Sequence, residues 1–239
     1  MPQEKTEAVV LRGVDFGETS RIVTFLTPVR GKMACMAKGL RRKGSSLAAA
    51  LDAFNRVELI YYWKDGRNVQ ILAEAALLDG FPGLRKDLEK GAFAAFPLEL
   101  AYKTAHENEP SQALYTALAE GLHSLDTWSG DARAHCCWQI MQLLASAGFA
   151  PALDDCARCG GPLPASPGFS FEGGAACHRC GADRRLTAQK LEALRRLQAA
   201  APPPEIKVDI EIFRMLRFYA MRQLDTEFRS VRVIEEMFG

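Results

Sequence analysis

The sequence predicts an α+β protein, in which a small N-terminal β-barrel precedes an α-helical domain that carries a four-cysteine zinc-binding module. Short β-branched and aromatic runs separated by turn residues fill the first 80 residues. Segments with apolar residues at three- and four-residue spacing follow from Leu84. Two Cys-x-x-Cys pairs interrupt this helical part. We therefore expect a barrel domain over residues 1–80 and a helical domain over residues 81–239.

The composition supports a folded chain with an uneven distribution of charge. Its 239 residues are 48% hydrophobic, which is enough for a core and excludes a disordered chain or a small disulfide scaffold. The net charge is only +1, but residues 1–79 carry 12 basic and 9 acidic side chains and residues 80–155 carry 5 and 10. The stretch from residue 19 to residue 51 contains seven basic residues and no acidic one. Near-neutrality is thus a cancellation between segments.

The N-terminal block predicts a barrel of five strands, and an Asp65-Gly66 hairpin turn separates the last two. Five short strands with a non-strand stretch between the third and fourth favour the OB-fold, a Greek-key barrel that binds oligonucleotides. An SH3-like barrel is the alternative. The first expected strand begins with residues 8–11 and the fifth with residues 69–72. The other three expected strands cover residues 21–27, 32–38 and 57–63.

Basic residues gather around the third expected strand and the loop that leaves it. A cluster of positive charge beside a barrel face can follow a phosphate backbone, so we interpret it as a nucleic-acid contact. The alternative is a face that only keeps the protein in solution. Tyr61, Tyr62 and Trp63 could add stacking, although strand alternation exposes only one face. The candidate binding residues here are Arg30, Lys32, Lys38, Arg41, Arg42 and Lys43.

The remainder of the chain predicts amphipathic helices. Pro97 is expected to kink or split the first of them. Cys136 and Cys137 are adjacent, so their side chains diverge on a helix and we take them as ordinary core or surface thiols. The expected helices cover residues 84–106, 111–125, 131–147, 187–200, 206–224 and 230–237.

The cysteine spacing is the most specific signal in the chain. One Cys-x-x-Cys pair is followed after 17 residues by a second, within a module of about residues 152–184. Two intervening residues let both thiolates of a pair face one ion, and Gly160, Gly161 and Gly181 stand where the tight turns need glycine. Four thiolates close a tetrahedral shell, which predicts one structural Zn²⁺. The expected ligands are Cys156, Cys159, Cys177 and Cys180.

Nothing in the sequence calls for an enzyme or for a membrane protein. Phosphate-binding GxxxxGK[ST], dinucleotide-binding GxGxxG, HExxH and GxSxG patterns are missing. No secretion signal is evident at the start, and no apolar run approaches the length of a transmembrane helix. We expect a non-enzymatic, cytoplasmic protein.

Taken together, these parts resemble the RecO family of bacterial recombination mediators. The resemblance extends over essentially the whole chain, and the order and spacing of short motifs carry it. The matching stretches lie at residues 9–11, 17–18, 21–27, 31–32, 37–42, 148–151, 156–159 and 228–230.

The resemblance implies binding of single- and double-stranded DNA and annealing of complementary strands. It also implies that the protein acts together with RecR to load the RecA recombinase onto strands coated by single-strand-binding protein. Arg21 and the basic loop fall where this family's barrel carries DNA-contacting charge, so Arg21 joins the candidate binding residues. The docking surfaces for the two protein partners are marked by no motif.

Two other functions remain open on the residues alone. One is a zinc-containing interaction scaffold whose basic face is only solubilising. The other is an RNA-binding protein, because OB-folds accept RNA as well as DNA.

Overall fold

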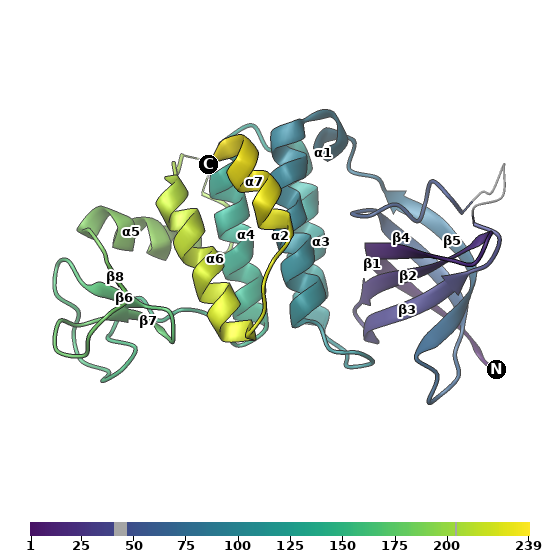
Figure 1. Ribbon diagram of the computed structural model, residues 1–239, viewed down its shortest axis with the longest axis horizontal. Coiled ribbons are helices and arrows are strands. Elements are labelled where there is room, and N and C mark those ends of the chain that lie inside the picture. The colour runs from purple at the N-terminus through teal and green to yellow at the C-terminus, as the bar shows by residue number, and fades with distance from the viewer. Residues whose placement is uncertain (41–46, 204) are drawn as a thin grey trace. The chain divides into compact units, whose positions relative to one another are not determined.

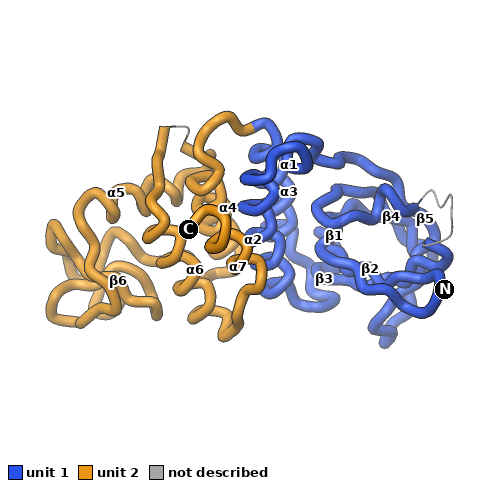
Figure 2. Tube along the Cα trace, turned by 45° about the horizontal axis from the view of Figure 1, so that its top comes forward, with its two compact units in different colours: residues 1–127 blue, residues 128–239 orange. Residues whose placement is uncertain are grey.

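The computed structural model describes residues 1–40, 47–203 and 205–239 (Figure 1). These residues form two compact units, residues 1–127 and residues 128–239 (Figure 2). Among the described residues, no helix combines the length and the apolar character that a membrane crossing requires.

Unit 1 opens with a closed barrel of five strands in the order β1-β2-β3-β5-β4. β1 pairs with both β2 and β4, and a parallel pairing of β3 with β5 closes the barrel. This is the OB arrangement, so the predicted fold class is confirmed and the SH3-like alternative is excluded. The strands are β1 (Gln3–Phe16), β2 (Ser20–Thr27), β3 (Gly31–Ala37), β4 (Arg56–Tyr62) and β5 (Val69–Asp79).

β1 begins earlier than the sequence pattern indicates. Its first residues, from Gln3 to Val9, pair with β4, and the rest of the strand pairs with β2. A register shift between Val10 and Arg12 lets one long strand bend and serve both partners. Polar residues such as Lys5 and Glu7 face outwards in this first part, and they hide the strand from a hydrophobicity pattern.

Strand alternation fills the barrel interior. Side chains such as Val23, Phe25, Cys35 and Leu59 are completely buried, while their sequence neighbours face outwards. Burial raises the pKa of Cys35 to about 12, so this thiol is a packing residue and not a reactive group.

Three helices complete unit 1: α1 (Pro82–Lys86), α2 (Leu88–Thr104) and α3 (Gln112–Thr127). The expected splitting at Pro97 is wrong, because α2 continues through it. The break in this region comes at Asp87, whose carboxylate accepts hydrogen bonds from the backbone N–H groups of Glu89 and Lys90. Buried side chains on both sides of the proline, including Phe93, hold the helix in one piece.

The barrel and these helices are joined by polar contacts within unit 1. The Lys32 ammonium donates to the Tyr102 carbonyl oxygen at 3.1 Å and lies 4.9 Å from the centroid of the Tyr102 ring. The Tyr115 hydroxyl donates to the Glu7 carboxylate at 2.9 Å. The backbone N–H of Lys32 donates to the His106 carbonyl oxygen at 3.0 Å.

Unit 2 surrounds a buried helix with a small sheet and three further helices. α4 (Ala132–Ser146) is buried along most of its length, and the Trp138 indole donates to the Ala199 carbonyl oxygen at 2.9 Å. The sheet has the order β7-β6-β8. The other elements are β6 (Gly168–Ser170), β7 (Gly174–Ala176), β8 (Arg184–Arg185), α5 (Ala188–Leu197), α6 (Ile210–Leu224) and α7 (Ser230–Phe238).

The close approach of β3 to the α2–α3 connection makes a glycine obligatory. Gly31 has φ +57°, and a Cβ atom there would meet the Glu109 carbonyl oxygen at 2.0 Å. Gly31→Ala should therefore lower the free energy of unfolding by about 3 kcal/mol, measured by urea denaturation. Gly17→Ala is the matched control, because Gly17 has φ +61° with nothing near its Cβ position. It should cost only about 1 kcal/mol, and equal losses for the two variants would contradict the steric argument.

Candidate metal centre and nucleic-acid interface

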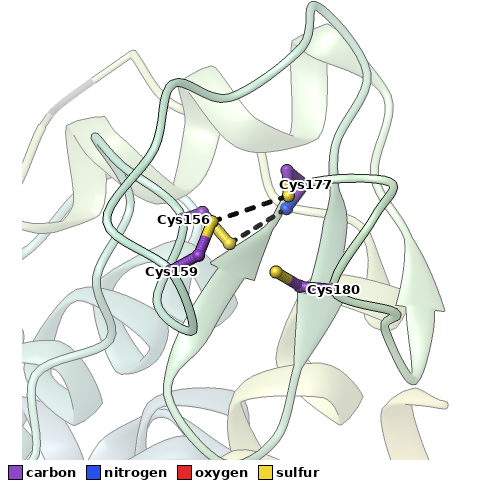
Figure 3. Close-up of side chains that lie close together, drawn as sticks. All are labelled: Cys156, Cys159, Cys177 and Cys180. Carbon is purple, nitrogen blue, oxygen red and sulfur yellow. Dashed lines mark hydrogen bonds between the residues drawn. The ribbon is translucent and has the colours of Figure 1, made fainter.

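Four cysteine side chains of unit 2 point into one common space (Figure 3). Their sulfur atoms all lie within 4.8 Å of one another. The predicted clustering of these residues is thus confirmed, although 17 residues separate the two pairs in sequence. The cluster consists of Cys156, Cys159, Cys177 and Cys180.

The spacing of the sulfur atoms fits a tetrahedral ion and not a disulfide. Cys159 Sγ and Cys177 Sγ are 3.9 Å apart, whereas a disulfide brings two sulfurs to about 2 Å. A tetrahedral ion with metal–sulfur distances of about 2.3 Å places its ligands about 3.8 Å apart. The four thiolates can therefore hold one metal ion with no position left for substrate.

Two tight turns bring each pair of sulfurs together. The N–H of Gly160 donates to the Cys156 carbonyl oxygen at 2.8 Å, and the N–H of Cys180 donates to the Cys177 carbonyl oxygen at 3.1 Å. Gly160 and Gly181 follow the pairs with φ of +67° and +72°, the left-handed region that glycine enters without strain. The sequence expectation is thus confirmed for Gly160 and Gly181, whereas Gly161 does not have a positive φ.

Backbone N–H groups in the turns favour the thiolate form. The N–H of Cys177 donates to Cys156 Sγ at 3.3 Å, and this bond is the largest of the effects that lower the pKa of Cys156 to about 6. The N–H of Arg179 lowers the pKa of Cys177 in the same way. The hydrogen bond with Cys159 instead raises the pKa of Cys180 to about 12. The turns therefore favour the thiolate form, which a metal ion binds, at Cys156 and Cys177.

The sulfur ligands belong to a small buried cluster of the module. It consists of Cys156, Ala176 and Cys177, with Leu163 and Cys180 packed against it. Leu153 and Phe169 of the module are buried as well, so a bound metal ion would stabilise a module that has only a modest apolar core. The remaining cysteines, Cys35, Cys136 and Cys137, are all buried elsewhere.

Arg30 and Lys32, two of the candidate DNA-binding residues in the barrel, are held by contacts inside unit 1. The Arg30 guanidinium donates to the Glu4 carboxylate at 2.7 Å and lies 4.0 Å from the centroid of the Trp63 ring. The hydrogen bond to Glu4 raises the pKa of Arg30. Lys32 is bound to Tyr102 on α2. Both cationic side chains therefore already make contacts within unit 1.

Arg21 and Lys38 lie at the opposite end of β2 and β3. Arg21 packs against β1, where it donates to the Gly13 carbonyl oxygen at 3.5 Å and lies 3.6 Å from the Asp15 carboxylate. Lys38 follows β3, is exposed, and forms no ion pair with any residue that the structure describes. Arg41, Arg42 and Lys43 lie outside the described residues.

An apolar row on the outside of the barrel lies beside these residues, and the sequence analysis missed it. The strand pairings place five outward side chains next to one another across all five strands. None of them is buried, and Val14 and Tyr62 are 47% and 38% exposed. We call this the outer row, and it consists of Val14, Ile22, Met36, Ile71 and Tyr62.

The exposed charge of Lys38 is close to the outer row in sequence. Lys38 lies in the turn that follows β3, two residues beyond Met36. Phe16, which is 53% exposed, lies two residues beyond Val14 on β1. Of the three aromatic residues considered for stacking, only Tyr62 is exposed, while Tyr61 and Trp63 are buried. The expectation that only one face of this strand is exposed is thus confirmed.

The structure defines a class of protein that joins an OB-type barrel to a helical unit with a four-cysteine metal centre. Comparison with known proteins gives the same picture. Residues 1–81 match the family model described as "Recombination protein O N terminal", and residues 85–232 match "Recombination protein O C terminal".

Curated relatives cover nearly the full chain. A DNA repair protein RecO of Anaeromyxobacter dehalogenans strain 2CP-1 is 37% identical over 85% of this chain and 84% of its own length. That of strain 2CP-C is 33% identical over 99% and 98%. The Myxococcus xanthus protein of the same name is 33% identical over 87% of each chain. This chain therefore belongs to the RecO family of DNA repair proteins.

Removal of one Cys-x-x-Cys pair should abolish metal binding. Cys156→Ser combined with Cys159→Ser leaves only two sulfur ligands, so we expect the metal content to fall from about one ion per chain to none. Elemental analysis of the dialysed protein measures it. Cys35→Ala removes a buried thiol from the barrel and should leave the metal content unchanged. Metal-free wild-type protein with a folded module and unmodified thiols would contradict the assignment.

Proposed function

We propose that this protein is a mediator of DNA repair and homologous recombination that binds single- and double-stranded DNA through the outer face of its barrel. It anneals complementary strands and, with RecR, helps to load RecA onto strands coated by single-strand-binding protein. It does so in the cytoplasm without a catalytic residue. The observation that carries the proposal is the outer row, whose apolar side chains lie on the outside of the barrel near Lys38. Lys38 belongs to the stretch of residues 19–51, which contains seven basic residues and no acidic one.

The proposed face combines the two interactions that bind single strands. Lys38 and the basic residues at positions 41–43 supply phosphate contacts, which need no sequence recognition. Arg21 contributes from the neighbouring strand end, while Arg30 and Lys32 have a smaller part because of their internal contacts. Tyr62 and the aliphatic side chains of the outer row offer surfaces on which bases stack.

Annealing follows from the same chemistry. Two complementary strands repel each other through their phosphates, and a basic surface that holds them close screens this repulsion. Base pairing then supplies the remaining free energy. No proton transfer and no nucleophile is needed, so the absence of an enzyme motif in the sequence is consistent with this function.

The metal in this proposal is one structural Zn²⁺. Four thiolates in a closed tetrahedral arrangement are the ligand set that zinc prefers in structural sites. Bound zinc would contribute on the order of 10 kcal/mol to the folding of such a module. The residues of this chain supply the turns and the deprotonated ligands.

The salt dependence of binding tests the basic loop. Arg41→Ala, Arg42→Ala and Lys43→Ala together should flatten the slope of log K against log salt by about two to three, because each lost phosphate contact removes about 0.7–0.9. Fluorescence anisotropy with single- and double-stranded oligonucleotides measures the slope. Lys5, Lys86 and Lys103, all exposed on other parts of unit 1, give a matched triple alanine control. An unchanged slope in the loop variant would defeat the assignment. Wild-type protein that binds no oligonucleotide at low salt would favour the scaffold.

Substitution of Tyr62 should lower the affinity for single strands without changing the slope of log K against log salt. Tyr62→Ala removes a stacking surface, and we expect binding of single strands to weaken by about 5-fold or more at constant salt. Leu77→Ala is the control, since Leu77 is 50% exposed on β5 but lies outside the outer row. Anisotropy titrations at two salt concentrations separate the effects. Equal affinities for both variants would remove the outer row from the binding face.

A further inference from the structure

Unit 2 contains a basic surface that the barrel-based function does not use. A cavity of about 290 Å³ lies between β8 and α6, and a second, more open cavity of about 760 Å³ lies between β8 and the second cysteine turn. Arg184, Arg185 and Leu186 line both. β8 is therefore a ridge with a hollow on each side, a shape suited to an extended ligand that crosses it.

The positive charge of the ridge and the first cavity rests mainly on Arg184 and Arg185. Lys190 and Arg214 also line the cavity, but both are engaged in ion pairs. Lys190 is paired with Glu211 and lies 3.3 Å from the Asp209 carboxylate, and Arg214 lies 3.6 Å from the Glu235 carboxylate. Arg185 is exposed and makes no side-chain hydrogen bond or ion pair with the described part of the chain. Around the ridge, residues 179–196 carry six basic and two acidic side chains.

Aromatic rings stand beside these charges. Phe171 and Phe218 both line the first cavity, with ring centroids 5.9 Å apart, and Phe218 is 39% exposed on α6. The Arg184 guanidinium lies 5.9 Å from the Phe171 centroid, and that of Arg217 lies 5.0 Å from the Phe218 centroid. An exposed ring flanked by guanidinium groups is a surface on which a nucleobase can stack.

We infer that this surface is a second binding site for single-stranded DNA, with a base stacked on Phe218 and the backbone crossing the β8 ridge at Arg184 and Arg185. The inference rests on the proposed function of the barrel and extends it to a second strand. A cavity of about 290 Å³ has room for a single base and part of its sugar. The paired arginines at the ridge lie where the adjacent phosphates would pass.

A protein ligand fits the surface less well. An extended peptide commonly binds by adding a strand to a sheet edge, where main-chain hydrogen bonds give most of the affinity. β8 is the edge strand of its sheet but is only two residues long, so it offers few such bonds. Phosphate contacts and stacking require side chains only, and these are present on both sides of the ridge.

A second site gives annealing a simple physical basis. One strand held on the barrel and another on unit 2 would be brought together within one chain, at an effective concentration far above that in free solution. The four-cysteine module has a direct part in this arrangement, because β8 pairs with β6 immediately beside the metal turns. The metal would then fix the shape of a DNA-contacting ridge without touching DNA itself.

The test uses the full chain with Arg184→Gln combined with Arg185→Gln, and separately Phe218→Leu. For a fluorescent single-stranded oligonucleotide, the double variant should flatten the salt slope by about 1.4, and Phe218→Leu should weaken binding about 5-fold. Phe218→Tyr should restore affinity because it keeps the ring. Arg196→Ala is the matched control, since Arg196 is exposed in the same unit but lines neither cavity. All variants should retain the metal content of the wild-type protein.

Photocrosslinking of the unmodified protein locates the site independently of any variant. An oligonucleotide that contains 5-bromodeoxyuridine should give a crosslinked peptide that includes Phe218 or the β8 arginines. If the barrel-loop variant loses DNA binding while the unit 2 variants bind like wild type, the second site is overturned and the barrel function stands. If the unit 2 variants lose binding to an acidic peptide but bind the oligonucleotide like the wild-type protein, the second DNA-binding site is likewise overturned. Wild-type protein that binds no oligonucleotide would remove both proposals.

Discussion

The convergence of four sulfur atoms is the constraint on which the shape of unit 2 around its small sheet depends. The module around them has only a modest apolar core, so a bound ion would add substantially to its stability. β6 and β8 are joined by only two residue pairs, and the metal turns flank them. Phe169 on β6 packs against Tyr219 of α6, with ring centroids 5.7 Å apart. Through this contact the module is fixed to the helices, and the surface between β8 and α6 acquires a defined form.

In unit 1 the corresponding constraint is the closure of the barrel. Once β3 pairs with β5, strand alternation sends one set of side chains inwards and leaves the other set outside. Where α2 and α3 cover the outside, the outward residues Val9 and Leu26 are buried as well. At the other end the outer row stays open to solvent. The same covering explains why Lys32 makes internal contacts, whereas Lys38 is exposed and forms no ion pair with the residues that the structure describes.

The sequence was sufficient for features that follow from local chemistry. Two Cys-x-x-Cys pairs with glycines behind them implied converging sulfurs, and alternation implied the barrel core. Features that depend on long-range pairing were missed. The outer row assembles residues from five strands, and no local pattern links Ile22 to Ile71. The contact of Arg30 with Glu4 joins two strands in the same way, so a basic residue in the sequence gave no sign that its charge was already paired. Pro97 failed as a breaker because buried contacts on both sides outweighed its local effect.

The overall net charge of +1 is a poor guide to what the surface can bind. Electrostatic binding depends on the charges within about a Debye length of the ligand, and that length is about 8–10 Å at physiological ionic strength. A count over a segment of sequence, such as the excess of acidic residues between residues 80 and 155, does not say which charges lie within that distance of a bound ligand. What matters at each place is whether a cation is already engaged inside the protein. Lys38 and Arg185 are exposed and free of ion pairs within the described residues, and each stands beside an exposed ring or apolar row. The pairing of an exposed cation with a stacking surface, and not the sum of charges, is the basis on which we propose both places as nucleic-acid contacts.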